Sequence, residues 1–109
     1  MTATSSSPHS ALSLRFTVQP GRREALLAEL AKILDLCARE PEFVAGYLHE
    51  SADCPYEIRL FEIWRGTRAD FERVQGPKPY RQEYLRNSRA LVAAVEVDWS
   101  VVARTWLPI

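Results

Sequence analysis

The chain has 109 residues, of which 47% are hydrophobic and 26% are charged, and its formal net charge at pH 7 is zero. This length predicts a single domain, and the composition is typical of an ordinary globular protein. The balanced charge argues against a nucleic-acid-binding protein, because such proteins carry a basic excess that contacts phosphates.

The first ten residues, "MTATSSSPHS", lack the basic start and the apolar stretch of a secretory signal. We therefore expect a disordered tail over 1–10 and one domain over 11–109. No segment approaches the ~20 apolar residues of a membrane span, which predicts a cytoplasmic protein without a membrane partner. Cys37 and Cys54 have no metal-ligand or redox spacing and are expected to be free thiols.

The domain begins with a predicted strand and helix. Residues 11–19 alternate between apolar and polar side chains, a period of two that predicts a half-buried strand, and Pro20 and Gly21 end it. Residues 22–40 change to the helical period, and Pro41 ends this helix. The apolar face of the helix consists of Leu26, Leu27, Leu30, Ile33, Leu34 and Cys37.

Two more predicted strands follow, 43–50 and 56–64, and the turn-forming segment 51–55 between them favours an antiparallel hairpin. The alternation of the second strand places Leu60, Glu62 and Trp64 on one face. The first strand is expected to carry Phe43, Ala45, Tyr47 and His49 on one face.

The last third of the chain predicts a broken helix and a long strand. Thr67 and Asp70 have the spacing of a capping box, which predicts a short helix as far as Gln75. Glycine and proline then interrupt the helical period, and it resumes over 80–94. Residues 95–106 alternate, and this strand is longer than the usual length of about six residues. We expect its end to reach across a dimer.

The predicted order is β-α-β-β-α-β, which is the ferredoxin-like order of an α+β protein with an antiparallel four-stranded sheet. Large apolar residues are expected on both faces of this sheet, but the helices can cover only one face. We therefore predict a symmetric homodimer in which two sheets pack face to face, forming a dimeric α/β barrel.

Several residues are candidates for a functional site. Trp64 is either core or the flat wall of a pocket for an aromatic substrate. Glu62, on the same strand face, is either paired with Arg15 or another arginine, or is a general base with a raised pKa. His49 is the alternative base, unless it faces solvent or the dimer interface. His9 falls in the predicted tail, and no clustered ligands indicate a metal site.

Tyr80 and Tyr84 are one helical turn apart, so both hydroxyl groups are candidates to point into one cavity. Arg81, Arg86 and Arg89 lie nearby in the sequence, and together these side chains offer a place for an anionic or enolate oxygen. The alternative is a tyrosine stripe that packs on the sheet, with the arginines in solvent.

Three segments in this order, "FTVQPGRREALLAEL", "EPEFVAGYLHES" and "FEIWRGTRADFERVQGP", resemble the antibiotic-biosynthesis monooxygenase family over residues 12–106. This group of dimeric α/β barrels includes quinol monooxygenases and the anthrone oxygenases of polyketide pathways. The resemblance implies a monooxygenase (an oxidoreductase) that oxidises a polycyclic phenol, anthrone or quinol with O2 in secondary metabolism. It also implies that the enzyme uses no cofactor.

By this resemblance, Trp64 matches a tryptophan that lines the substrate cavity, and Phe71 matches an apolar position on the next helix. Leu60 stands where anthrone oxygenases carry asparagine, and Val74 where quinol-type members carry histidine. These departures leave two alternatives open: an isomerase or cyclase with the same pocket, or a non-catalytic ligand-binding accessory protein. The predicted catalytic residues are His49 and Glu62. The predicted substrate-binding residues are Trp64, Leu60, Phe71, Tyr80, Tyr84 and Arg15.

Overall fold

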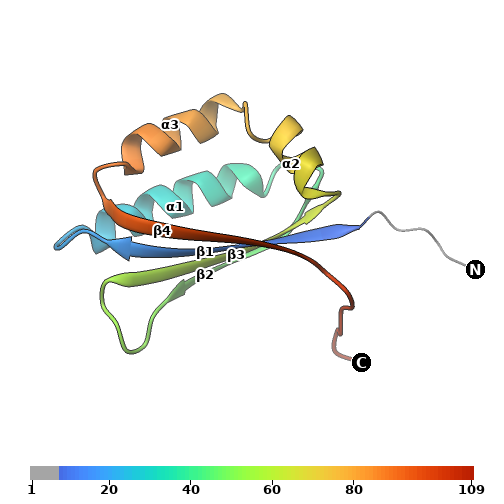
Figure 1. Ribbon diagram of the computed structural model, residues 1–109, viewed down its shortest axis with the longest axis horizontal. Helices are drawn as coiled ribbons and strands as arrows, with labels where there is room; N and C mark the ends of the chain where they lie inside the picture. Colours follow the sequence, from blue (N-terminus) through green and yellow to red (C-terminus); the bar gives the residue numbers. More distant parts are fainter. Residues whose placement is uncertain (1–7) are drawn as a thin grey trace, which may run out of the picture.

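The computed structural model describes residues 8–109, and it confirms the predicted ferredoxin-like α+β fold with the second helix broken in two. The elements are β1 (His9–Val18), α1 (Arg23–Cys37), β2 (Phe43–Glu50), β3 (Glu57–Arg65), α2 (Arg68–Val74), α3 (Pro79–Ser88) and β4 (Val92–Val101). The strands form one antiparallel sheet in the order β2-β3-β1-β4, and all the helices lie on one face of it (Figure 1). No helix within residues 8–109 is long and apolar enough to cross a membrane.

The period of two in the central strands creates the main core. Leu12 and Phe16 of β1 and Ile58 and Leu60 of β3 are buried on the face that the helices cover, here called the helix face. The stripe predicted on α1 packs onto them, with Leu26 and Leu30 fully buried. A sheet face and a helix stripe of matching apolar character therefore fix which side of the sheet the helices cover.

A tight turn and a helix cap connect β3 to α2. Gly66 has a φ of 97°, which suits glycine, and it turns the chain immediately after the strand. The Thr67 hydroxyl accepts a hydrogen bond from the backbone N–H of Asp70 (3.1 Å), and the Asp70 carboxylate accepts one from the Thr67 N–H (2.9 Å). The predicted capping box is confirmed, and it places Phe71 one turn into the helix, close to the end of β3.

The first and last strands have different bounds from those predicted. β1 begins at His9, so the predicted tail ends earlier than residue 10, and residues 1–7 of that prediction lie outside the described residues. β4 starts at Val92 and ends at Val101 instead of covering 95–106. Over residues 8–109 it pairs with β1 alone, and that pairing ends at Ser10 and Val101, near the start of β1. The segment after Val101 bends away on the side opposite the helices (Figure 1).

The far face of the sheet, which no helix covers, is half apolar and half charged. Tyr47 and Phe61 are exposed on it and lie opposite each other on neighbouring strands. Arg15 and Glu96 form an ion pair on its other half. The expectation of large apolar residues on both faces therefore holds for only part of this face.

An irregularity in β2 corrects one prediction about the faces. The register between β2 and β3 shifts between Phe43 and Ala45. As a result Phe43 lies opposite Trp64 on the helix face, whereas Tyr47 and His49 lie on the far face. A strict period of two cannot anticipate such a bulge, because the bulge adds one residue on one strand only.

Candidate functional site

The candidate site is built around a buried glutamate and tryptophan on β3. Glu62 is 4% exposed and Trp64 is 1% exposed, and both lie on the helix face as the alternation of the strand predicts. The indole Nε1 of Trp64 donates a hydrogen bond of 2.9 Å to Oε1 of Glu62. The expected ion pair between Glu62 and Arg15 is wrong, because Arg15 lies on the opposite face of the sheet and pairs with Glu96.

Aromatic side chains from two elements contact Trp64, and a third ring contacts one of them. The ring of Phe43 meets it edge-on at 5.1 Å between centroids, and Phe71 of α2 meets it in the same way at 5.1 Å. Phe71 in turn contacts Trp99 of β4, also at 5.1 Å. Such edge-to-face contacts fix ring orientation, so the indole N–H stays directed at Glu62.

Burial changes the acid–base properties of this region. It raises the pKa of the Glu62 carboxyl, and the hydrogen bond from Trp64 and the charge of Arg81 offset part of this increase. Burial also raises the pKa of the Cys37 thiol, and it raises the pKa of Tyr84 to about 12. Cys37 and Tyr84 therefore stay protonated near neutral pH, and Glu62 is the group here with the proton affinity that suits a general base.

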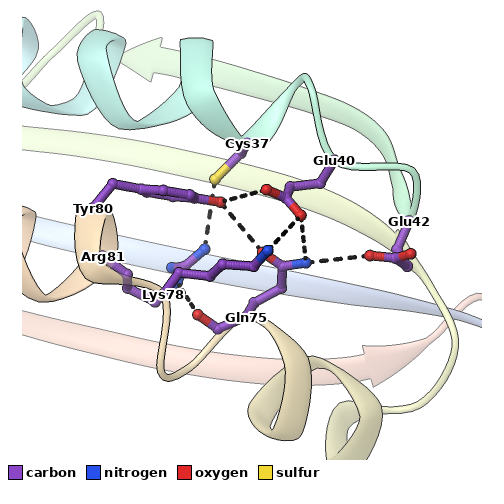
Figure 2. Close-up of polar contacts among 7 residues, drawn as sticks. All are labelled: Cys37, Glu40, Glu42, Gln75, Lys78, Tyr80 and Arg81. Atoms are coloured by element: carbon purple, nitrogen blue, oxygen red, sulfur yellow. Dashed lines mark hydrogen bonds and ion pairs between the residues drawn. The ribbon is translucent and has the colours of Figure 1, made fainter.

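A polar network surrounds the junction of α2 and α3 (Figure 2). Gln75, only 1% exposed, donates from Nε2 to Oε1 of Glu40 (3.4 Å) and to Oε1 of Glu42 (3.3 Å). The Tyr80 hydroxyl donates to Oε1 of Gln75 (3.3 Å) and to Oε2 of Glu40 (3.4 Å), and Nζ of Lys78 lies 3.2 Å from Glu40 Oε1. This network fixes α3 to the loop between α1 and β2.

A cavity of about 370 Å³ lies beside Trp64, within the usual size range of small-molecule sites. We refer to it as the Trp64 cavity. Its lining comes from β3, from α2 and from the loop before β2, and it includes Trp64, Phe71, Val74, Gln75, Glu42 and Asp70. A second, mainly apolar groove of about 500 Å³ lies between α3 and β4 and includes Tyr84.

The structure brings together most of the predicted site residues but not all of them. Leu60, Glu62, Trp64, Phe71, Tyr80 and Tyr84 all lie between the sheet and the helices. The two tyrosines do not share one cavity, because the Tyr80 hydroxyl bonds to the polar network and Tyr84 borders the α3–β4 groove.

Two predicted site residues lie elsewhere. His49 is exposed on the far face, 5.9 Å from the Phe61 ring and 6.5 Å from the Tyr47 ring between centroids. Arg15 lies on the same far face. The sheet separates both side chains from Glu62 and Trp64.

The prediction missed Gln75, and it did not single out Arg81 from the other arginines of α3. Arg81 donates from Nε to the backbone carbonyl of Gln75 (3.2 Å) and from Nη2 to Sγ of Cys37 (3.5 Å). A glutamine at a helix end carries no recognisable signal. Over the part of the chain that the structure describes, no group of three His, Cys, Asp or Glu side chains is placed to hold a metal ion.

The fold defines a class, the ferredoxin-like α+β proteins, and in this chain a cavity lies beside Trp64 on the face of the sheet that the helices cover. Residues 11–82 match the antibiotic biosynthesis monooxygenase family, and the chain belongs to this family. None of the curated proteins matches the sequence significantly.

Solved structures agree with this assignment. PA3566 from Pseudomonas aeruginosa has a TM-score of 0.80 and 25% identity, over 93% of this chain and 100% of that one. Rv0793 from Mycobacterium tuberculosis has a TM-score of 0.72 and 28% identity, over 91% and 97%. SnoaB from Streptomyces nogalater, described as a cofactor-independent oxygenase, has a TM-score of 0.77 and 24% identity, over 94% and 100%.

Proposed function

We propose that this protein is a cofactor-independent monooxygenase that oxidises a polycyclic phenol, anthrone or quinol with O2 in secondary metabolism. Membership of the family and the structural likeness to SnoaB support an oxygenase. The observation that carries the proposal is the buried Glu62, which accepts a hydrogen bond from the indole of Trp64, a residue that lines a cavity of substrate size.

Glu62 is the proposed general base, because His49 faces away from the site. Its carboxylate takes a proton from an acidic O–H or C–H group of the substrate, which leaves a phenolate or enolate. This anion passes one electron to O2, and the resulting substrate radical and superoxide combine through a new C–O bond. The peroxide takes the proton back from Glu62, and loss of water leaves a carbonyl at an anthrone CH2. One oxygen atom enters the product and the other leaves as water.

The Trp64 cavity is the proposed substrate site. The rings of Trp64 and Phe71 offer aromatic surface, while Asp70, Gln75 and Glu42 supply polar groups at its wall. Arg65 and Arg73 also line the cavity, and this combination of aromatic surface and polar groups suits a flat aromatic molecule with oxygen substituents.

An isomerase or cyclase is the second candidate, and two residues favour it. Leu60 and Val74 are apolar at places where the oxygenases that the sequence resembles carry asparagine and histidine. A buried base of raised proton affinity serves enolisation equally well, with the proton returned to another carbon and no O2 consumed. The two candidates therefore differ in the use of oxygen.

The proposed assembly is a homodimer with the two far faces in contact. Tyr47 and Phe61 are exposed on that face, and the C-terminal segment, in which Trp106 and Leu107 are exposed, runs on the same side of the sheet (Figure 1). In a dimer, the segment after Val101 reaches across to the partner and covers part of this apolar surface.

The test is oxygen uptake with a dihydroxyanthrone or a quinol as substrate. We expect Glu62→Gln, which keeps the shape and removes the base, to lower turnover by roughly 10²–10⁴-fold with the fold intact. Glu57→Gln is the matched control, because Glu57 is on the same strand but pairs with Arg59 on the far face. A decrease in turnover of no more than about threefold for Glu62→Gln contradicts the assignment of Glu62 as the base. Product formation without oxygen uptake supports the isomerase or cyclase.

A further inference from the structure

Arg81 differs from the other arginines of the chain in its surroundings. It is half-buried, and within residues 8–109 it forms no ion pair with a carboxylate. Its partners are the Gln75 carbonyl, the Cys37 sulfur and the Phe71 ring, whose centroid lies 4.9 Å from the guanidinium carbon. Every other arginine either belongs to an ion pair or is exposed.

The guanidinium group of Arg81 is partly removed from water, and the groups that it contacts directly are all neutral. Arginine has five N–H donors in a planar fork that suits an anionic oxygen. Neutral acceptors satisfy only part of this capacity, and a charged acceptor forms the stronger hydrogen bonds. Arg81 therefore keeps N–H donors free for a charged acceptor, beyond its electrostatic interaction with Glu62.

The position of Arg81 connects this cation to the proposed site. Phe71 and Gln75, both in contact with Arg81, are lining residues of the Trp64 cavity. Glu62 is connected to the same aromatic pair through its hydrogen bond with Trp64, which contacts Phe71. The groups that face Glu62 from the helices are Cys37 of α1 and Tyr84 and Arg81 of α3, and of these only Arg81 is charged near neutral pH.

We propose that Arg81 binds the anionic oxygen of the substrate and that Gln75 is the positioning residue that holds Arg81 in place. The proposal rests on the proposed function and assigns the residue that binds the ionised oxygen of the substrate. When Glu62 takes the proton it becomes neutral, and the negative charge now resides on the substrate oxygen. Arg81 then stabilises the anion that the reaction creates.

Gln75 suits the positioning role because both its backbone and its side chain form hydrogen bonds with neighbouring residues (Figure 2). Its carbonyl accepts from Arg81, while its buried amide joins Glu40, Glu42 and the Tyr80 hydroxyl. Without the Gln75 amide, α2 and α3 are less firmly held at their junction. The guanidinium of Arg81 then loses its fixed orientation but keeps its charge.

The test compares binding of 4-nitrophenol at a pH where it is ionised with binding of its neutral methyl ether, 4-nitroanisole, by titration calorimetry. We expect Arg81→Gln to weaken phenolate binding by about 10–100-fold, the value of one charge-assisted hydrogen bond, and to leave ether binding nearly unchanged. Arg81→Lys should restore part of the phenolate affinity. Gln75→Ala should weaken phenolate binding by a smaller factor, with the ether again unaffected.

Arg86→Gln is the matched control, because Arg86 is on the same helix but is exposed. A spectroscopic readout adds a second criterion: the wild type should lower the apparent pKa of bound 4-nitrophenol, and Arg81→Gln should abolish that decrease. Equal effects on phenolate and ether, or no effect on either with circular dichroism unchanged, would overturn the proposal. A wild type that binds phenolate through Arg81 but consumes no oxygen refutes the proposed monooxygenase and leaves this inference standing.

Discussion

Replacement of Trp64 by phenylalanine separates the hydrogen bond to Glu62 from the packing of the ring. The indole N–H is the donor that Glu62 accepts from in the described structure, and both side chains are buried. Loss of a hydrogen bond to a charged acceptor decreases stability by about 1.5–3 kcal/mol. The smaller ring still meets Phe43 and Phe71, so the cavity that it leaves adds only about 1 kcal/mol.

We therefore expect Trp64→Phe to lower the free energy of unfolding by about 2.5–4 kcal/mol, which corresponds to a decrease in Tm of roughly 10–20 °C for a domain of this size. The decrease should depend on pH. Burial raises the pKa of Glu62 in the folded protein, so the stability that this group contributes is present below its unfolded pKa and is lost as pH rises through the folded value. Because the Trp64 hydrogen bond lowers that pKa, its removal makes the loss larger at higher pH.

The assay is urea unfolding followed by circular dichroism at pH 5 and pH 8. Trp99→Phe is the matched control, since Trp99 contacts the same Phe71 ring and, within residues 8–109, its indole donates to no carboxylate. Equal destabilisation by the two substitutions would refute the reasoning. A decrease in the free energy of unfolding by Trp64→Phe that is the same at both pH values would also refute it.

Two further predictions concern the far face of the sheet. Light scattering after size-exclusion chromatography should give about twice the chain mass of 12.4 kDa. Phe61→Glu places a charge in the proposed interface and should shift the protein to monomer. A wild-type monomer at micromolar concentration contradicts the dimeric barrel. His49→Ala should leave turnover within about twofold of wild type, because this side chain is separated from Glu62 by the sheet; a loss of more than about tenfold would return the role of base to His49.

The local pattern of the sequence was sufficient for the fold and for the centre of the site. Alternation along β3 placed Leu60, Glu62 and Trp64 on one face, and the Thr67–Asp70 spacing predicted the cap that brings Phe71 to Trp64. These features depend on residues near one another in the chain, and local periodicity describes them well.

What the sequence did not reveal depends on contacts between distant segments. The bulge near Phe43 arises from pairing with β3, and the end of β4 is set by the length of β1. Arg81 could not be distinguished from Arg86 and Arg89 by its neighbours in sequence, because its inward position depends on Cys37, some 44 residues away. Distant contacts of this kind leave no periodic signal in the chain.

The central claim, that the protein oxidises its substrate with O2 and its own side chains, is tested most directly by isotope incorporation. The purified protein, first treated with a chelator and checked by absorbance for flavin and haem, is incubated with a dihydroxyanthrone under ¹⁸O2, and the product is analysed by mass spectrometry. The account predicts one ¹⁸O atom per product molecule, one O2 consumed per turnover, and loss of both signals with Glu62→Gln. A product without ¹⁸O, or turnover that requires an added flavin or metal, would contradict it.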